Sequence, residues 1–346
     1  MQPINHTPFV LAGAVFLDKN GAEHFLVALK MTYRIALDGT LSIAAEQAPL
    51  RPADVMTHPE VPELSSIRHE AEMEPPKPAT DCLLQGCACA PHAGATAVEV
   101  RFGCGPLEKR AAVFGDRVWR RQMNIAVASP PQPFEKIPLT YENGFGGLDL
   151  TPEEERHRGG ELRNPAGRGY RAHQSRRLLD QERLPNIEEI GRPMTYPEQR
   201  LNPVGFGPIG RHWQPRLGYA GTYDQQWVEE RLPLLPLDFD ARFHHAAPPD
   251  LVYPGFVRGG EPVLVQGCTH GPPVGFRLPL VRPLARIRLC NGDVQPEMTC
   301  QTVCVDMERM KLRLLWKGCL NVHRKLLRIR EFECRLDGGA LGGERE

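Results

Sequence analysis

The sequence predicts a mainly β protein of antiparallel sheets, sandwich or barrel-like, with a long loop-rich middle and a few short helices. Glycine and proline account for 33 and 34 of the 346 residues, which interrupts the chain too often for long helices. The turn pairs Asn20-Gly21 and Asp38-Gly39 separate apolar runs, which is typical of hairpins. Residues 98–102 alternate between apolar and charged side chains, as a half-buried strand requires.

Residues 1–138 are expected to form an N-terminal β-rich lobe. The expected strands cover residues 10–17, 25–35, a third strand after residue 39, then 81–89, 97–104 and 109–114. Between these blocks, residues 47–80 are rich in proline, glutamate and histidine and lack apolar periodicity. We therefore expect this segment to cross the surface, with a short helix near residues 64–71.

Residues 139–250 form a central segment that is dense in glycine, proline, arginine and aromatic residues. Only short helices are expected in it, at residues 152–158 and 238–246. A free coil of this length is uncommon in a compact domain. The central segment is therefore predicted to be a small lobe or a functional surface held by internal hydrogen bonds.

Residues 251–336 are expected to form a C-terminal β-rich lobe that packs with the N-terminal one, so that both ends of the chain build the sheets. The expected strands cover residues 262–266, 275–278, 285–290, 300–305 and 311–317. A hairpin loop is predicted at residues 306–309. The basic run at residues 323–330 is expected to be an edge strand, followed by a flexible tail over residues 337–346.

Charge and composition exclude several classes of partner. Lysine plus arginine equals aspartate plus glutamate at 42 each, so no overall field draws the chain to nucleic acid or to an anionic membrane. The first nine residues do not resemble a secretory signal, and no apolar stretch of about 18 residues occurs. We expect a cytoplasmic protein whose ten cysteines are thiols.

The central segment holds the most specific signals, because its glycines and prolines fix loop shapes while its aromatic and arginine side chains are typical interface anchors. The candidates for binding a partner or shaping the loops are Tyr141, Glu142, Asn143, Phe145, Gly146, Gly147, Asn164, Gly167, Gly169, Glu188, Trp213, Gly221, Thr222, Tyr223, Trp227, Arg231 and Phe239. The expected contacts are Tyr141, Asn143, Phe145, Tyr223, Trp227 and Phe239, with Arg231 as a polar anchor. Packing of these groups onto the sheets is the alternative.

These motifs resemble an uncharacterised-domain family encoded beside the spike, PAAR-tip and effector genes of type VI secretion systems. The motifs are Tyr-Glu-Asn-x-Phe-Gly-Gly from residue 141, Asn-Pro-x-Gly-Arg-Gly from 164, Leu-Pro-Asn-Ile-Glu from 184, Gly-Phe-Gly-Pro-Ile from 205 and Gly-Thr-Tyr-Asp-x-x-Trp from 221. The resemblance implies a chaperone or adaptor, without catalytic residues, that binds an effector or its PAAR-like domain and delivers it to the valine-glycine-repeat spike. The alternatives are a structural spike or baseplate component and a hydrolytic effector, and the oligomeric state stays open.

Metal and nucleotide sites are weaker interpretations. Soft ligands gather at Cys82, Cys87, Cys89 and His92, but no paired Cys-x-x-Cys module accompanies them, so buried thiols are expected there and no metal. Residues 205–210 match the glycine spacing of a dinucleotide fingerprint, yet the surrounding prolines exclude the strand and helix that it needs. No cofactor is expected.

The sequence also gives little support for a hydrolase or for a phosphate-binding site. The pair His244-His245 lies near several aspartates, but no nucleophile motif accompanies it. The arginines of residues 156–177 are interleaved with glutamates, which favours a solvated, salt-bridged surface over a nucleic-acid site.

Overall fold

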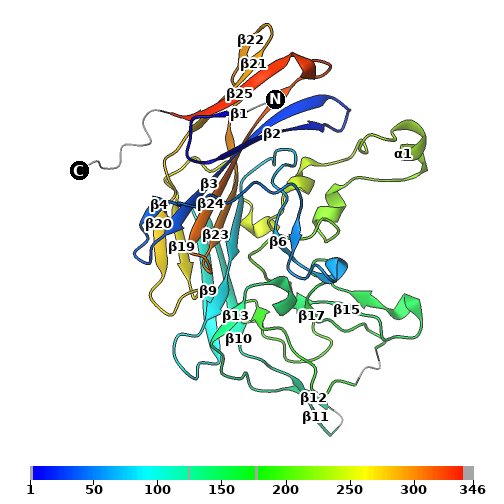
Figure 1. Ribbon diagram of the computed structural model, residues 1–346. Helices are drawn as coiled ribbons and strands as arrows, with labels where there is room; N and C mark the ends of the chain where they lie inside the picture. The colour runs from blue at the N-terminus through cyan, green and yellow to red at the C-terminus, as the bar shows by residue number, and fades with distance from the viewer. Residues whose placement is uncertain (1–2, 124, 176–177, 338–346) are drawn as a thin grey trace.

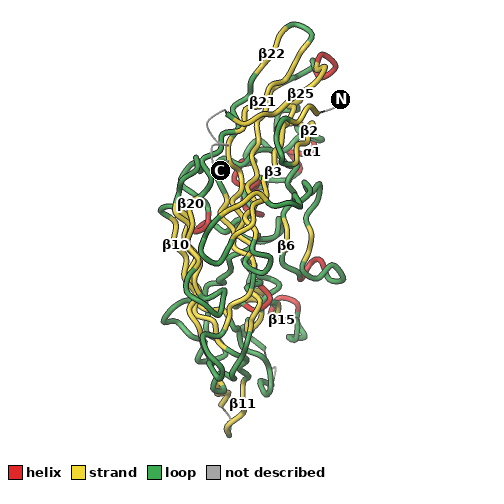
Figure 2. Tube along the Cα trace, turned by 60° about the vertical axis from the view of Figure 1, so that its left-hand side comes forward, coloured by secondary structure: helices red, strands yellow, loops and turns green. Residues whose placement is uncertain are grey.

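The computed structural model describes residues 3–123, 125–175 and 178–337. The predicted fold class is confirmed, because this part of the chain is mainly β with several antiparallel sheets and short helices, and its strands form no closed barrel. The molecule is elongated, with the hairpin β21 (Pro283–Leu289) and β22 (Gly292–Val294) at one end (Figure 1, Figure 2). The hairpin β11 (Trp119–Gln122) and β12 (Ile125–Ala128) lies at the other.

The largest sheet combines strands from both ends of the chain, as predicted. Its order is β2 (Val10–Leu17), β3 (Glu23–Ile35), β24 (Lys311–Asn321), β23 (Thr299–Asp306) and β7 (Asp81–Gln85), with β4 (Leu41–Ile43) also pairing with β3. β7 runs parallel to β23, and the other pairs are antiparallel. The predicted turns at residues 18–21 and 306–309 connect β2 to β3 and β23 to β24.

A second, five-stranded sheet is antiparallel throughout. Its order is β18 (Ile187–Glu188), β10 (Leu107–Phe114), β9 (Ala97–Cys104), β19 (Pro262–Gln266) and β20 (Val274–Arg277). In β9 the side chains of Val100, Phe102 and Cys104 are buried, so the predicted alternation is confirmed. β18 comes from the central segment, which therefore contributes a strand to the framework.

The third sheet corrects the prediction for the C-terminal end. Its order is β1 (Pro3–Asn5), β25 (Ile329–Leu336), β21 and β22. The prediction of an edge strand at residues 323–330 is wrong, because most of that run forms a turn and the helix η7 (Leu326–Arg328). β25 begins only at Ile329 and is an inner strand, since β1 pairs with it in parallel. The predicted tail lies, from residue 338, outside the described residues.

Smaller pairs and single helical turns complete the fold. The two-stranded pairs are β5 (Val55–Met56) with β6 (Ile67–His69), β8 (Cys87–Cys89) with β13 (Lys136–Pro138), β11 with β12, β14 (Phe145–Gly146) with β17 (Arg168–Gly169), and β15 (Leu148–Asp149) with β16 (Gly159–Gly160). The helices are α1 (Gln225–Glu230) and the 3₁₀ turns η1 (Pro62–Leu64), η2 (Tyr141–Asn143), η3 (Glu155–His157), η4 (Arg216–Tyr219), η5 (Ala241–His244), η6 (Pro249–Leu251) and η7.

Several local predictions need correction. The helix predicted near residues 64–71 is instead the strand β6, because Ile67 and His69 pair with β5. The strand predicted over residues 81–89 divides at Gly86, whose φ of +142° directs β7 and β8 into different sheets. The helices predicted at residues 152–158 and 238–246 contain only the single turns η3 and η5. α1 was not predicted.

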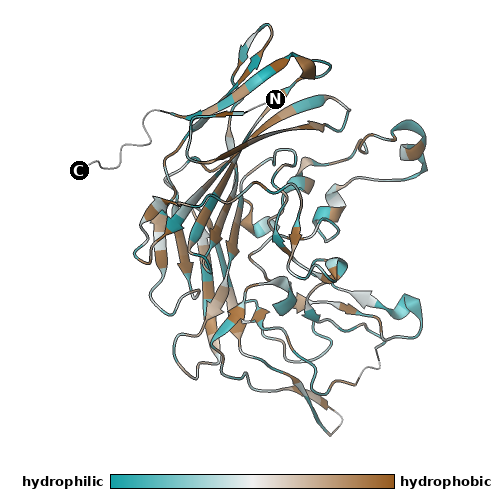
Figure 3. Ribbon diagram, in the orientation of Figure 1, coloured by the Kyte–Doolittle hydropathy of each residue, from teal (hydrophilic) through white to brown (hydrophobic). Residues whose placement is uncertain are grey.

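One hydrophobic core lies between the larger sheets. Val27 and Leu29 of β3 share it with Val100 and Phe102 of β9. Figure 3 shows the hydrophobic residues concentrated along these strands, whereas many outer loops are hydrophilic. Each buried CH₂ group contributes about 0.8 kcal/mol to stability, so this shared core is the main stabilising term. The core also joins the two sheets.

A buried polar cluster connects the central segment to β7. The Nζ atom of Lys77 lies 2.6 Å from both Glu70 Oε2 and Asp81 Oδ2. The other oxygen of Asp81 lies 2.6 Å from Nδ1 of His245, and backbone N–H groups of Ala246 and Ala247 donate to Oδ2. Since buried charges need partners, this cluster fixes residues 245–247 against the sheet.

Among the described residues, no helix is both long and apolar enough to cross a bilayer.

Candidate partner-binding surface

The predicted site residues divide between two environments. Tyr141, Phe145, Asn164, Glu188 and Trp213 are buried. In contrast, Thr222 and Tyr223 are exposed, while Trp227, Arg231 and Phe239 are partly exposed. The first group therefore shapes the loops from within, and the second lies where a partner can reach it.

Glycines in the first group allow two backbones to approach closely. A Cβ atom on Gly146 would lie 2.1 Å from the carbonyl oxygen of Asn164, and one on Gly147 would lie 2.5 Å from that of Gly167. The side-chain amide of Asn164 donates to the carbonyl oxygens of Tyr141 at 2.8 Å and Phe145 at 3.0 Å. These contacts hold β14 parallel to β17, which explains why the motif needs glycine and asparagine at these positions.

Replacing Gly147 with alanine is expected to lower the free energy of unfolding by about 2–3 kcal/mol. The φ of Gly147 is +94°, and the added methyl group would clash with a backbone oxygen that cannot rotate away. Urea denaturation measures the change. The matched control is Gly207→Ala, because a Cβ atom there meets nothing within 4 Å, and it should leave the urea midpoint unchanged. Equal midpoints for both variants would contradict this account.

Hydrogen bonds also engage Glu142 and Asn143, which are half-buried beside the first group. Ser66 donates from its backbone N–H and its hydroxyl to the carboxylate of Glu142, at 2.7 and 2.9 Å. Asn143 donates to the carbonyl oxygen of Pro138 and accepts from Arg168. Glu142 therefore connects the central loops to the segment before β6, and Asn143 connects them to β13 and β17, so both act in loop shaping.

Two further members of the first group stabilise the interior. Burial raises the pKa of Glu188 above its usual value, although Arg117 lies 2.7 Å away. The ring of Trp213 packs edge-on against Tyr141 with centroids 5.4 Å apart. Gly169, with a φ of +94°, lies close to Pro185. Because the side chains of Glu188 and Trp213 are buried, neither forms an accessible contact surface.

The second group lies on a protruding segment, residues 220–239, which we call the arm. Figure 1 shows the arm extending from the sheets, with α1 near its tip. Asp224 caps α1 by accepting a hydrogen bond from the N–H of Trp227 at 2.9 Å, as the Asp at this position of a helix should. The ring of Tyr223 lies 4.7 Å from that of Trp227, centroid to centroid.

Hydrogen bonds fix the shape of the arm at several points. At its base, Thr222 donates to Asp238 from both its backbone N–H and its hydroxyl. Gly221, with a φ of +85°, leaves room for that carboxylate. Farther out, Arg231 donates to the carbonyl oxygens of Leu235 and of Lys19, which lies in the β2–β3 turn. The arm is therefore held by its own contacts and by the largest sheet.

Large apolar side chains nevertheless remain exposed on the arm. Tyr223, Leu232 and Leu237 have 52%, 58% and 65% of their surface accessible, and Val228 is also exposed. Exposed single apolar residues are common, but several on one ordered protrusion are typical of an interaction surface. Phe239 packs against Phe243 at the base of the arm, with ring centroids 5.7 Å apart.

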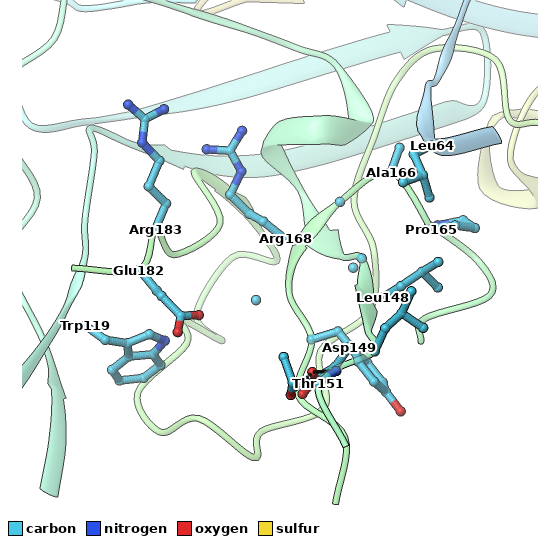
Figure 4. A pocket seen from close by; sticks show the side chains of 16 residues that line it. Leu64, Trp119, Leu148, Asp149, Thr151, Pro165, Ala166, Arg168, Glu182 and Arg183 are labelled. Atoms are coloured by element: carbon cyan, nitrogen blue, oxygen red, sulfur yellow. Dashed lines mark hydrogen bonds between the residues drawn. The ribbon is translucent and has the colours of Figure 1, made fainter. Parts of the chain in front are cut away.

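A cleft of about 790 Å³ lies in the central loops. Its walls include the motif residues Gly146, Gly147, Gly167 and Gly169. Figure 4 shows Leu148, Pro165 and Ala166 on one side, with Trp119 and Glu182 across from them. The glycines thus shape a mainly apolar hollow that can accept a side chain or an extended segment of another molecule.

The predicted soft-ligand set does not converge. Cys82 is fully buried, Cys89 donates to the carbonyl oxygen of Cys268, and the His92 ring lies beside the carbonyl oxygen of Ala93. In residues 3–123, 125–175 and 178–337, no three His, Cys, Asp or Glu side chains are grouped so that they could hold a metal ion. Burial raises the pKa of the Cys87 and Cys89 thiols, which disfavours the thiolates that a metal would need.

The glycines of residues 205–210 have a different role from that of a nucleotide loop. A Cβ atom on Gly205 would lie 2.4 Å from the ring of Tyr141, and one on Gly210 would lie 2.8 Å from the ring of Trp213. Gly205 and Gly210 therefore make space for aromatic rings.

Sequence reasoning missed the buried cluster of Lys77, Asp81 and His245, and it missed the cleft. His245 lies far from the other two in the chain, and no local pattern brings it to them. For the cleft, the glycine motif was the available signal, but its walls depend on loop pairings that only the structure reveals.

Comparisons with known proteins identify the family. Neither the search of curated proteins nor the search of solved structures gives a match. The family model described as "Uncharacterized protein conserved in bacteria (DUF2169)" matches residues 20–317, which include most of the strands, the cleft and the arm. Because this match covers far more than half of the sequence, the chain belongs to the DUF2169 family.

Proposed function

We propose that this protein binds another polypeptide through the arm and acts as a chaperone or adaptor that loads a secreted effector onto a type VI secretion spike. The observation that carries the proposal is the exposure of Tyr223, Leu232 and Leu237 on a segment whose backbone is fixed by hydrogen bonds. The secretion system and the PAAR-like class of partner come from the resemblance of the motifs.

A partner that covers the arm removes apolar surface from water at about 25 cal/mol per Å². Because Thr222 and Arg231 already fix the arm, little conformational entropy is lost when the partner binds. Tyr and Trp are enriched among the residues that dominate binding energy, and Tyr223 and Trp227 form such a pair.

The experiment is co-expression of the tagged chain with the effector and spike proteins encoded beside it, followed by affinity purification. The triple variant Tyr223→Ser, Leu232→Ser, Leu237→Ser is expected to recover at least about tenfold less effector than the wild type. Its thermal unfolding should stay unchanged, because all three side chains lie mainly in solvent.

The matched control replaces Leu37, Leu280 and Leu327 with serine, since these leucines are exposed on other parts of the surface. The control should capture the effector as well as the wild type does. Full capture by the arm variant, or equal effector solubility and secretion without the chain, would reject the proposal. A chaperone should also be absent from the assembled spike, whereas a structural component would co-purify with it.

A further inference from the structure

The outer edge of β2 is open. Within the described residues, β2 pairs only with β3, over eight consecutive positions without a bulge. The hydrogen-bonding groups on its other side therefore face away from the sheet. Val15 and Leu17 on this strand are 45% and 57% exposed.

The other outer strands of the three larger sheets are short or covered. β18, β20, β1 and β22 contain two to four residues, and β20 and β22 carry the charged residues Arg277 and Asp293. β7, at the opposite edge of the same sheet, is covered by the central segment, because Leu84 donates to the carbonyl oxygen of Phe206. β2 thus differs from every other described edge of these sheets.

Native proteins protect long edge strands with charges, proline, bulges or a covering segment. β2 has the sequence Val-Leu-Ala-Gly-Ala-Val-Phe-Leu, which contains neither charge nor proline. An open, uncharged edge of eight residues is suited to accept another strand.

We infer that this edge pairs with β2 of a second copy of the chain, antiparallel, about a twofold axis at Ala14. A twofold axis normal to the sheet pairs residues on the same face, so the two residue numbers in each pair differ by an even number. With the axis at Ala14, Gly13 faces Val15, Ala12 faces Phe16 and Leu11 faces Leu17.

Side-chain size favours this register and a second copy as the occupant. Ala12 and Gly13 each lie opposite a larger residue, and only Ala14, on the axis, faces another small residue. With the axis at Gly13, by contrast, glycine faces glycine and Ala12 faces Ala14, which leaves the centre poorly packed. The edge is therefore complementary to itself, and it carries no charge that repels its own copy.

The test measures the mass of the purified full-length chain by sedimentation equilibrium up to about 100 μM, since a single strand pair forms a small interface with micromolar affinity. The wild type is expected to form a dimer. Ala14→Lys and Ala14→Glu each place like charges opposite one another and should weaken the dimer at least about tenfold. An equimolar mixture of the two variants should restore it, because Lys then faces Glu.

The control is Leu37→Lys, which adds the same charge at an exposed position outside β2 and should dimerise like the wild type. Hydrogen exchange of the wild type gives a measurement that needs no variant, because amides of β2 should gain protection at high concentration. A monomeric wild type at all concentrations, a dimer that Ala14→Lys leaves intact, or a mixture that stays monomeric would each overturn the inference. The inference does not depend on the arm.

Discussion

Replacing Asp81 with alanine is expected to lower the free energy of unfolding by about 3–5 kcal/mol. The substitution removes the carboxylate that lies 2.6 Å from Lys77 and from His245, and it leaves the N–H groups of Ala246 and Ala247 without their acceptor. Lys77 keeps Glu70 as a partner, but one of its two buried ion pairs is lost, and buried donors without an acceptor destabilise a fold. Denaturation with urea measures the loss.

The matched control is Glu154→Ala. Glu154 and Arg156 are also 2.6 Å apart, but both are exposed. Water competes for an exposed ion pair, so this variant should unfold at the urea concentration of the wild type. Similar losses for the two variants would show that burial does not determine the contribution of Asp81.

Lowering the pH provides a second comparison of the wild type with Asp81→Ala. Burial alone would raise the pKa of Asp81, but the charge of Lys77 and the hydrogen bond with His245 outweigh it and hold this pKa below its usual value. The stability that Asp81 contributes is therefore present above about pH 4, the pKa of an unfolded aspartate, and is lost as pH falls through its lower folded value. The difference between wild type and Asp81→Ala should narrow in that acidic range.

Replacing Trp213 with alanine is expected to lower the free energy of unfolding by about 3–5 kcal/mol. This side chain is fully buried and packs against Tyr141, so its removal leaves a cavity. Trp227→Ala should instead leave most of the stability intact, since Trp227 lies on the arm. In affinity purification the ranking of the two variants should reverse. Per folded molecule, Trp227→Ala should recover less effector than Trp213→Ala. Equal stability of the two variants would contradict the assignment of Trp213 to the interior.

The sequence predicted most strands correctly, since hairpin turns and alternation are local. The turn at residues 18–21 and the alternation in β9 show this directly. The inner position of β25 was missed, because it depends on parallel pairing with β1 from the other end of the chain. α1 was missed because six residues give too short a pattern to distinguish a helix from a turn.

A partner-binding role for the central segment stays a prediction, and the sequence did not separate its buried candidate residues from its exposed ones. Trp213 and Trp227 both lie among glycines and prolines, and their local sequences give no measure of burial. Only the packing of Trp213 against Tyr141, and the projection of the arm beyond the sheets, distinguish a structural ring from an accessible one. Lys77 and Asp81 gave no signal, because their third partner, His245, is distant in the chain.

The pairing of β3 with β24 has a consequence for biosynthesis. β3 is among the first strands to leave the ribosome, yet β24 on one of its sides is among the last. Until translation is almost finished, this edge of β3 has no native neighbour, and long-range strand pairing is slow. Most of the nascent polypeptide must therefore wait, with apolar strands uncovered, before its principal sheet can close.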